Sequence, residues 1–425
     1  MPNTEEILQT GGSSELVDCG VIPHPVPARE WPILAVLVSI QFIHILDFTI
    51  MMPLGPQFMR LYEITPQQFA LLVSIYMFSA GIFGFIAAFI IDHFDRKATL
   101  IVLCGGFSVA TLLCALAVDY ETLLAARAVA GAFGGVMGAT VFSIIADIIP
   151  EYRRGAATGT VMSSFPITSV IGVPTGLFLA EIMDWRAPFV FLTIMGLLVI
   201  IAALRILPPV RGHLIHQRDR NPLRQFQKIF SNANHLVAFI LIAMLMFAGF
   251  TVIPFISPYM VVNVGMSEAD LPYLYFFGGL STFFAAHLIG QLADRYGKRR
   301  IFCIVAILSI IPIWLVTHLS KAPIAQALAV TTLFMVLVTG RFVPAMALIT
   351  ASVAPHVRGS FMSFNSSIQQ ISAGLATLMA GSIMGVSVTG EMTHFDAVGV
   401  IAIIATVLCI YLSTKLRSNE ELTTK

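Results

Sequence analysis

The chain has 425 residues, of which 57% are hydrophobic and only 11% carry a formal charge. Soluble domains carry about 25% charged residues, so this composition indicates a membrane protein and excludes a sizeable soluble domain. The net charge of +1 and the absence of a basic stripe do not indicate a nucleic-acid partner.

The apolar residues fall into twelve segments long enough to cross a bilayer, which takes about 20 residues as a helix. The first 29 residues are polar and acidic and predict a disordered tail rather than a signal peptide. A polar linker at 208–233 separates two six-helix bundles at 30–207 and 234–416, and 417–425 form a second tail. The predicted spans are 31–58, 66–92, 98–118, 121–148, 156–182, 187–207, 234–262, 269–294, 300–319, 323–352, 359–386 and 395–416.

Charge placement predicts the orientation of these spans. With the N-terminus in the cytoplasm, most of the 24 Lys and Arg residues fall in cytoplasmic loops, the linker and the tail. Only Arg60, Arg186 and Lys321 fall in outside loops. The positive-inside rule therefore places both termini and the linker in the cytoplasm.

A charged loop between spans occurs twice. The second copy resembles the signature of the major facilitator superfamily, G-x-x-x-D-R-x-G-K/R-K/R, and carries Gly290, Asp294, Arg295, Gly297, Lys298 and Arg299. The first copy retains Asp92, Arg96 and Lys97 but has Ala88, His93 and Asp95 at the other positions. The resemblance implies that both loops are cytoplasmic gates, with Asp147 at the end of the fourth span pairing with the first. A positive-inside turn without a switching role is the alternative.

Ionisable residues within the first and fourth spans are candidates for proton coupling. Asp47 is the one carboxylate well inside a predicted span, and His44 lies on the same helix face. Arg127 of the fourth span, in a pattern that resembles the family's R-x-x-x-G motif, is expected at a similar depth. A carboxylate that can take a proton opposite an arginine suits a coupling site, whereas a static salt bridge or an arginine that snorkels to the surface is the alternative.

The fifth span resembles a motif of drug/proton antiporters and of the sugar-efflux branch of the superfamily. The residues that carry it are Gly172, Pro174 and Gly176, followed by Trp185, Arg186 and Phe189. Glycine and proline predict a bendable helix with a flat face against the other half of the molecule. A packing motif without bearing on transport direction remains the alternative.

Polar residues of the second half are candidates for a substrate cavity, although helix packing is an equal alternative. They are Tyr259 and Asn263 of the seventh span, Arg341 of the tenth, and Asn365 and Gln369 of the eleventh. The five scattered cysteines have no metal-binding or disulfide spacing, and no cofactor is expected.

Together, the residues and the resemblance imply an all-α membrane protein of twelve helices in two pseudo-symmetric bundles, acting by alternating access. We expect a monomeric secondary transporter in a plasma membrane of the bacterial inner-membrane kind, which exports a small organic compound in exchange for protons. An uptake symporter or uniporter of the same fold is the alternative, followed by a polytopic membrane enzyme or sensor.

Overall fold

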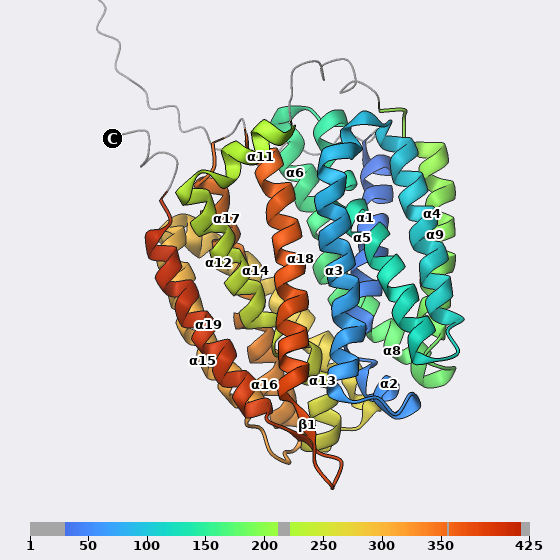
Figure 1. The fold of residues 1–425 in the computed structure, drawn as a ribbon, viewed down its shortest axis with the longest axis vertical. Helices are drawn as coiled ribbons and strands as arrows, with labels where there is room; N and C mark the ends of the chain where they lie inside the picture. Colours follow the sequence, from blue (N-terminus) through green and yellow to red (C-terminus); the bar gives the residue numbers. More distant parts are fainter. Residues whose placement is uncertain (1–29, 211–221, 355–356, 418–425) are drawn as a thin grey trace, which may run out of the picture.

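The computed structural model describes residues 30–210, 222–354 and 357–417, and almost all of them lie in helices. The helices form two bundles side by side (Figure 1), the first half in blue to green and the second in yellow to red. The predicted tail 1–29, the predicted tail 417–425 apart from Arg417, and the linker segment 211–221 lie outside the described residues. We call the end of the molecule that carries helix α11 the linker end, and the end that carries α2 and strand β1 the hairpin end.

The first half consists of nine helices and two irregular turns. They are α1 (Trp31–Ile50), α2 (Gly55–Leu61), α3 (Pro66–Ile90), η1 (Ile91–His93), α4 (Arg96–Ala115), α5 (Tyr120–Ile148), α6 (Glu151–Met162), α7 (Ser164–Ile167), the π-helical turn η2 (Thr168–Gly172), α8 (Val173–Ile182) and α9 (Ala187–Ile206).

The second half has the same six-span plan and adds a short β-hairpin, in which Gly385 lies opposite Thr393. Its elements are α12 (Ala233–Phe250), η4 (Ile253–Phe255), α13 (Ile256–Tyr259), η5 (Met260–Val264), η6 (Glu268–Asp270), α14 (Leu271–Tyr296), α15 (Lys298–Thr317), α16 (Ile324–Phe334), η7 (Met335–Thr339), α17 (Phe342–Ala351), α18 (Arg358–Ile383), β1 (Gly385–Val386), β2 (Met392–Thr393) and α19 (Phe395–Lys415).

Eleven helical segments of the described chain are long and apolar enough to cross a membrane. The eleventh predicted span, which is α18, has 26 residues but too many polar ones to meet the same hydropathy criterion. Because α18 packs along α3 of the other half, its polar residues do not have to face lipid. The first span ends earlier than predicted, at Ile50, since turns and the separate helix α2 follow it.

Local sequence explains where the helices begin. Thr65 and Gln68 form a capping box at the start of α3, and Asp119 with Thr122 forms another at the start of α5. Each satisfies amide groups that the first helical turn leaves without partners. The aspartate at position 95, which replaces a glycine of the loop signature, caps α4 by accepting hydrogen bonds from the Lys97 and Ala98 amides.

The two halves meet along α3 and α18 and along α14 and the fifth span. A Cβ atom at Gly81 would lie 2.6 Å from Ile371 of α18, and one at Gly279 would lie 2.8 Å from the Ser169 side chain. At the hairpin end, Arg60 and Glu268 form a bidentate ion pair between the halves. The hydrogen bond to Glu268 raises the pKa of Arg60 above its ordinary value. The two halves are therefore in contact at their hairpin ends.

The predicted linker contains a helix, α11 (Pro222–Phe230), which the sequence analysis did not anticipate. Its Phe226 ring lies 6.1 Å from Phe85 of α3 and 5.6 Å from Phe364 of α18, measured between centroids. Apolar residues recur on one face of this short helix, and burying that face against both halves stabilises it.

Candidate functional site

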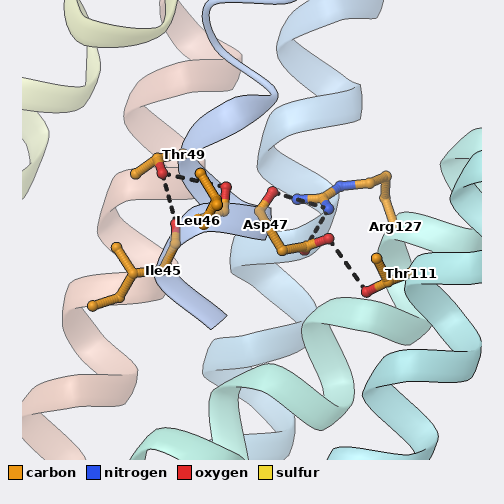
Figure 2. A network of polar contacts seen from close by, with 6 residues as sticks. All are labelled: Ile45, Leu46, Asp47, Thr49, Thr111 and Arg127. Atoms are coloured by element: carbon orange, nitrogen blue, oxygen red, sulfur yellow. Dashed lines mark hydrogen bonds and ion pairs between the residues drawn. The ribbon is translucent and has the colours of Figure 1, made fainter. Parts of the chain in front are cut away.

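Asp47 of α1 and Arg127 of α5 form an ion pair inside the first half, shown in Figure 2. The Arg127 guanidinium donates to Asp47 Oδ2 over 2.7 Å, and both side chains are at most 1% exposed. Thr111 of α4 donates a hydrogen bond to Asp47 Oδ1 over 3.3 Å. Asp47 and Arg127 therefore lie close together, as predicted, and residues of α1, α4 and α5 make the contacts.

Neighbouring groups hold the pair in place. The Arg127 guanidinium lies over the Tyr76 ring of α3, 4.4 Å from its centroid, so that a cation–π contact supplements the ion pair. Glycines bring α3 and α5 together here, because a Cβ at Gly131 would lie only 2.3 Å from the Tyr76 carbonyl oxygen. Thr49, also drawn in Figure 2, donates to the Ile45 carbonyl and so faces its own helix rather than the pair.

The burial of Arg127 excludes one sequence-based alternative for the conformation described here. A snorkelling arginine exposes its guanidinium at the membrane surface, whereas the Arg127 side chain is 1% exposed and bound to Asp47. A static salt bridge and a coupling site both require this geometry, so the choice between them rests on experiment.

His44 lies one turn before Asp47 on α1 and is half-buried. Within the described chain, neither of its ring nitrogens has a hydrogen-bond partner. Its ring centroid is 6.5 Å from that of Tyr76 and 6.2 Å from that of Phe107. His44 therefore adjoins the ion pair through Tyr76 without bonding to Asp47.

The first charged loop joins elements of its own half. Arg96 Nε donates to Asp147 Oδ2 over 3.1 Å, which is the contact that the family resemblance implies. Lys97 Nζ donates to the Leu204 carbonyl over 2.9 Å and also to the Leu207 carbonyl, at the end of α9. The side chain of Asp92 lies outside the described part of the structure.

The second charged loop repeats part of this arrangement. Gly297 has a φ of +96°, a value that favours glycine, and it separates α14 from α15 as the signature predicts. Arg299 donates to the Leu416 carbonyl after the end of α19 over 2.6 Å, as Lys97 does at the end of α9. Asp294 is exposed and makes no ion pair with any described residue. Arg295 lies 5.4 Å from the ring centroid of Tyr296.

The fifth span is irregular at the motif, where a π-helical turn interrupts the α-helix, and its glycines do not face the predicted neighbour. The π-helical turn η2 ends at Gly172, and Pro174 lies in the first turn of α8. A Cβ at Gly172 would lie 3.2 Å from Leu46, and one at Gly176 would lie 2.7 Å from Ile50, both on α1 of the same half. The expectation of a flat glycine face against the other half is wrong for these glycines, because Ser169 makes that contact instead.

Of the residues proposed for a substrate cavity, Arg341, Asn365 and Gln369 are wholly or partly buried in the second half. Arg341 is 1% exposed and donates to Ser309 over 3.0 Å and to Thr406 over 2.8 Å, within the second half. Asn365 is buried and Gln369 half-buried on α18; the Asn365 amide has no hydrogen-bond partner in the described chain.

The two remaining cavity candidates lie at the hairpin end. Tyr259 donates to the Leu319 carbonyl over 3.0 Å, and Asn263 exchanges hydrogen bonds with the backbone of Met392. These contacts hold the end of the seventh span in place, so both polar groups make the packing contacts that were the alternative to a substrate cavity.

Sequence reasoning overlooked two members of the buried network, Tyr76 and Thr111. A tyrosine and a threonine are unremarkable in an apolar span, and only the packing of α3 and α4 against α5 brings them to the ion pair. The glycine repeat at Gly131 and Gly135 was the available signal, since small residues mark where another helix approaches.

Comparisons with known proteins agree with this architecture. The family model of the Major Facilitator Superfamily matches residues 37–377 and 238–424. The uncharacterized MFS-type transporter YwfA of Bacillus subtilis is 27% identical over 373 residues, covering 85% of this chain and 86% of that protein. A probable sugar efflux transporter of Helicobacter acinonychis is 21% identical and covers 57% of this chain and 61% of its own length.

Two solved structures share the fold at low sequence identity. A D-xylose–proton symporter superposes with a TM-score of 0.75 at 15% identity, covering 92% of this chain and all of that one. A bacterial homologue of the human lysosomal transporter Spinster, in an inward-facing and unoccupied conformation, gives 0.71 at 17% identity, covering 92% and 98%.

Proposed function

The chain belongs to the major facilitator superfamily, and on that premise we propose that it is a proton-coupled exporter of a small organic compound. The observation that supports coupling best is the buried ion pair of Asp47 and Arg127. A carboxylate inside a membrane span is costly, and such groups mark proton and ion pathways. Asp47 is the proposed proton acceptor, and Arg127 is the partner that stabilises its charged form.

Protonation of Asp47 would remove the counter-charge of a fully buried arginine. Breaking a buried pair in this way is strongly destabilising, by about 3–5 kcal/mol when one partner is removed. The protonated protein should therefore favour another arrangement of α1, α3 and α5 in which Arg127 gains water or a different acceptor. Such a difference between two conformations is what links proton binding to alternating access.

The charged loops act as gates at the linker end in this proposal. The Arg96–Asp147 ion pair joins α4 to α5. Lys97 and Arg299 donate hydrogen bonds to backbone carbonyls at the ends of α9 and α19. Lysine and arginine are concentrated in these loops, so the positive-inside rule favours a cytoplasmic linker end and cytoplasmic termini. Because the relatives are bacterial, the proposed location is the cytoplasmic membrane of a bacterium, and the proposed state is a monomer.

Two observations bear on the direction of transport. The fifth-span motif and the relative named as a probable sugar efflux transporter favour export. An uptake symporter is the second candidate, because the matching D-xylose–proton symporter has the same fold.

Transport into everted membrane vesicles, driven by an imposed pH gradient, tests the proposal with a compound selected by a thermal-shift screen. Export predicts uptake into the vesicles that stops when the gradient is collapsed. Asp47→Asn should abolish gradient-driven uptake but retain downhill exchange. Asp184→Asn, at an aspartate with 47% side-chain exposure at the hairpin end, is the matched control and should behave like the unaltered protein. Full gradient-driven uptake by Asp47→Asn would contradict the coupling role.

A further inference from the structure

Three polar side chains beside the ion pair have buried atoms that no described residue satisfies. Gln41 and His44 lie one turn apart on α1, and Tyr76 lies on α3. The unpartnered atoms are Gln41 Oε1, both ring nitrogens of His44, and the Tyr76 hydroxyl. The Tyr76 side chain as a whole is 0% exposed.

Glycines of α5 gather these groups into one site. A Cβ atom at Gly134 would lie 2.4 Å from the Tyr76 hydroxyl and 3.0 Å from His44 Cδ2. A Cβ atom at Gly138, one turn further, would lie 3.8 Å from Gln41 Oε1 and 3.8 Å from His44 Cε1. The three polar groups therefore lie in a strip along the glycine face of α5, and at Gly134 even a Cβ atom would collide with the Tyr76 hydroxyl.

The chemistry of the strip indicates what it binds. A glutamine oxygen accepts, a tyrosine hydroxyl both donates and accepts, and a neutral imidazole offers one donor and one acceptor. This mixture of uncharged donors and acceptors is complementary to hydroxyl groups, because a hydroxyl group both donates and accepts hydrogen bonds. Buried polar groups without a partner cost free energy, so a solute or water that bonds to them is favoured.

Aromatic rings border the strip and connect it to the ion pair. Phe107 lies edge-on to His44 at 6.2 Å between centroids, and Phe48 lies 5.5 Å from Tyr76. The Tyr76 ring also contacts the Arg127 guanidinium, which lies 4.4 Å from its centroid. A solute bonded to the Tyr76 hydroxyl would thus touch a ring that helps to hold the proposed coupling pair.

The geometry points to Gln41, His44 and Tyr76 as a substrate subsite for an uncharged, polyhydroxylated compound. The inference rests on the proposed function, since it takes the transported solute to enter the first half beside Asp47. It adds the substrate class and the side chains that select it.

Equilibrium binding to the purified full chain in detergent tests the subsite. The probes are D-glucose and D-xylose, with tetraphenylphosphonium as a charged apolar comparison, and the readouts are calorimetry and ligand-induced thermal shift. At least one sugar should bind, and Tyr76→Phe should weaken it about tenfold, or about 1.4 kcal/mol. Because the Tyr76 hydroxyl has no partner among the described residues, the melting temperature without ligand should not fall.

Tyr259→Phe is the matched control, since that hydroxyl donates to the Leu319 carbonyl at the hairpin end. It should lower the melting temperature and leave sugar affinity unchanged. Gln41→Leu provides a second variant and should weaken sugar binding without altering the Arg127 contact of Tyr76.

Several results would overturn the subsite: no sugar binds the unaltered protein, only tetraphenylphosphonium binds, or Tyr76→Phe and Gln41→Leu both retain full affinity. Binding is measured without a pH gradient, so it does not depend on proton coupling. Lost coupling in Asp47→Asn with unaltered sugar affinity in both Tyr76→Phe and Gln41→Leu would reject the subsite and leave the proposed function standing. Weakened affinity in Tyr76→Phe with full coupling in Asp47→Asn would reject the coupling role alone.

Discussion

A double-mutant cycle on the buried ion pair gives the most direct measure of what protonation of Asp47 costs. Asp47→Asn leaves the Arg127 guanidinium with no counter-charge at a position with 1% side-chain exposure. Arginine stays charged in proteins, so it cannot relieve this cost by losing its proton. We expect Asp47→Asn to lower the free energy of unfolding by about 3–5 kcal/mol.

Arg127→Gln, the other single variant, should lower the free energy of unfolding by less. In Arg127→Gln the lone Asp47 carboxyl can take up a proton and keep its hydrogen bond from Thr111. The double variant removes both charges and should be more stable than Asp47→Asn alone. The two changes are therefore strongly non-additive, with a coupling of at least about 1 kcal/mol.

Unfolding in mixed micelles with increasing SDS, followed by circular dichroism, measures the four proteins of the cycle. A Gly159→Ala variant at an open position of α6 serves as a control for handling in detergent. A loss below about 1 kcal/mol for Asp47→Asn, together with additive effects in the double variant, would refute the reasoning. The pair would then be too weak to favour one conformation over another.

Three further predictions follow from packing and charge. Gly135→Ala should lower the free energy of unfolding by about 1–3 kcal/mol, because the new Cβ would lie 2.3 Å from the Ala80 carbonyl oxygen. Gly155→Ala is the control: its Cβ meets nothing within 4 Å and should not lower the melting temperature. Charge reversal of Arg60 to Glu should increase labelling of cysteines introduced at the hairpin end, and the added Glu268→Arg change should restore protection. Arg341→Met should maintain or raise stability in thermal unfolding, since the buried guanidinium bonds only to two hydroxyls in the described chain.

The six-plus-six plan, the charged loops and the pairing of Asp47 with Arg127 were all predictable from the sequence. A long apolar segment forms a helix in a bilayer, because a helix pairs all of its backbone N–H and C=O groups within the segment. A lone carboxylate and a lone arginine at similar depth have few partners other than each other. The special role of Gly297 was equally readable, since its turn needs a positive φ.

Other assignments failed because they depend on which neighbour each helix face meets. Gly172 and Gly176 contact α1 rather than the other half, and Tyr259 and Asn263 fasten the hairpin end. Asp294 belongs to the intact signature yet makes no ion pair within the described structure, while the imperfect first loop forms the Arg96–Asp147 contact. Spacing along one helix places a residue on a face, but it does not say what lies opposite.

Local hydropathy and charge specify the class of protein, the six-plus-six plan and the residues that are too costly to bury without a purpose. Which polar groups lie together depends on how the helices pack. Tyr76, His44 and Gln41 are separated along the chain and meet on a glycine face of α5 because helix packing, a long-range property, brings α1 and α3 there.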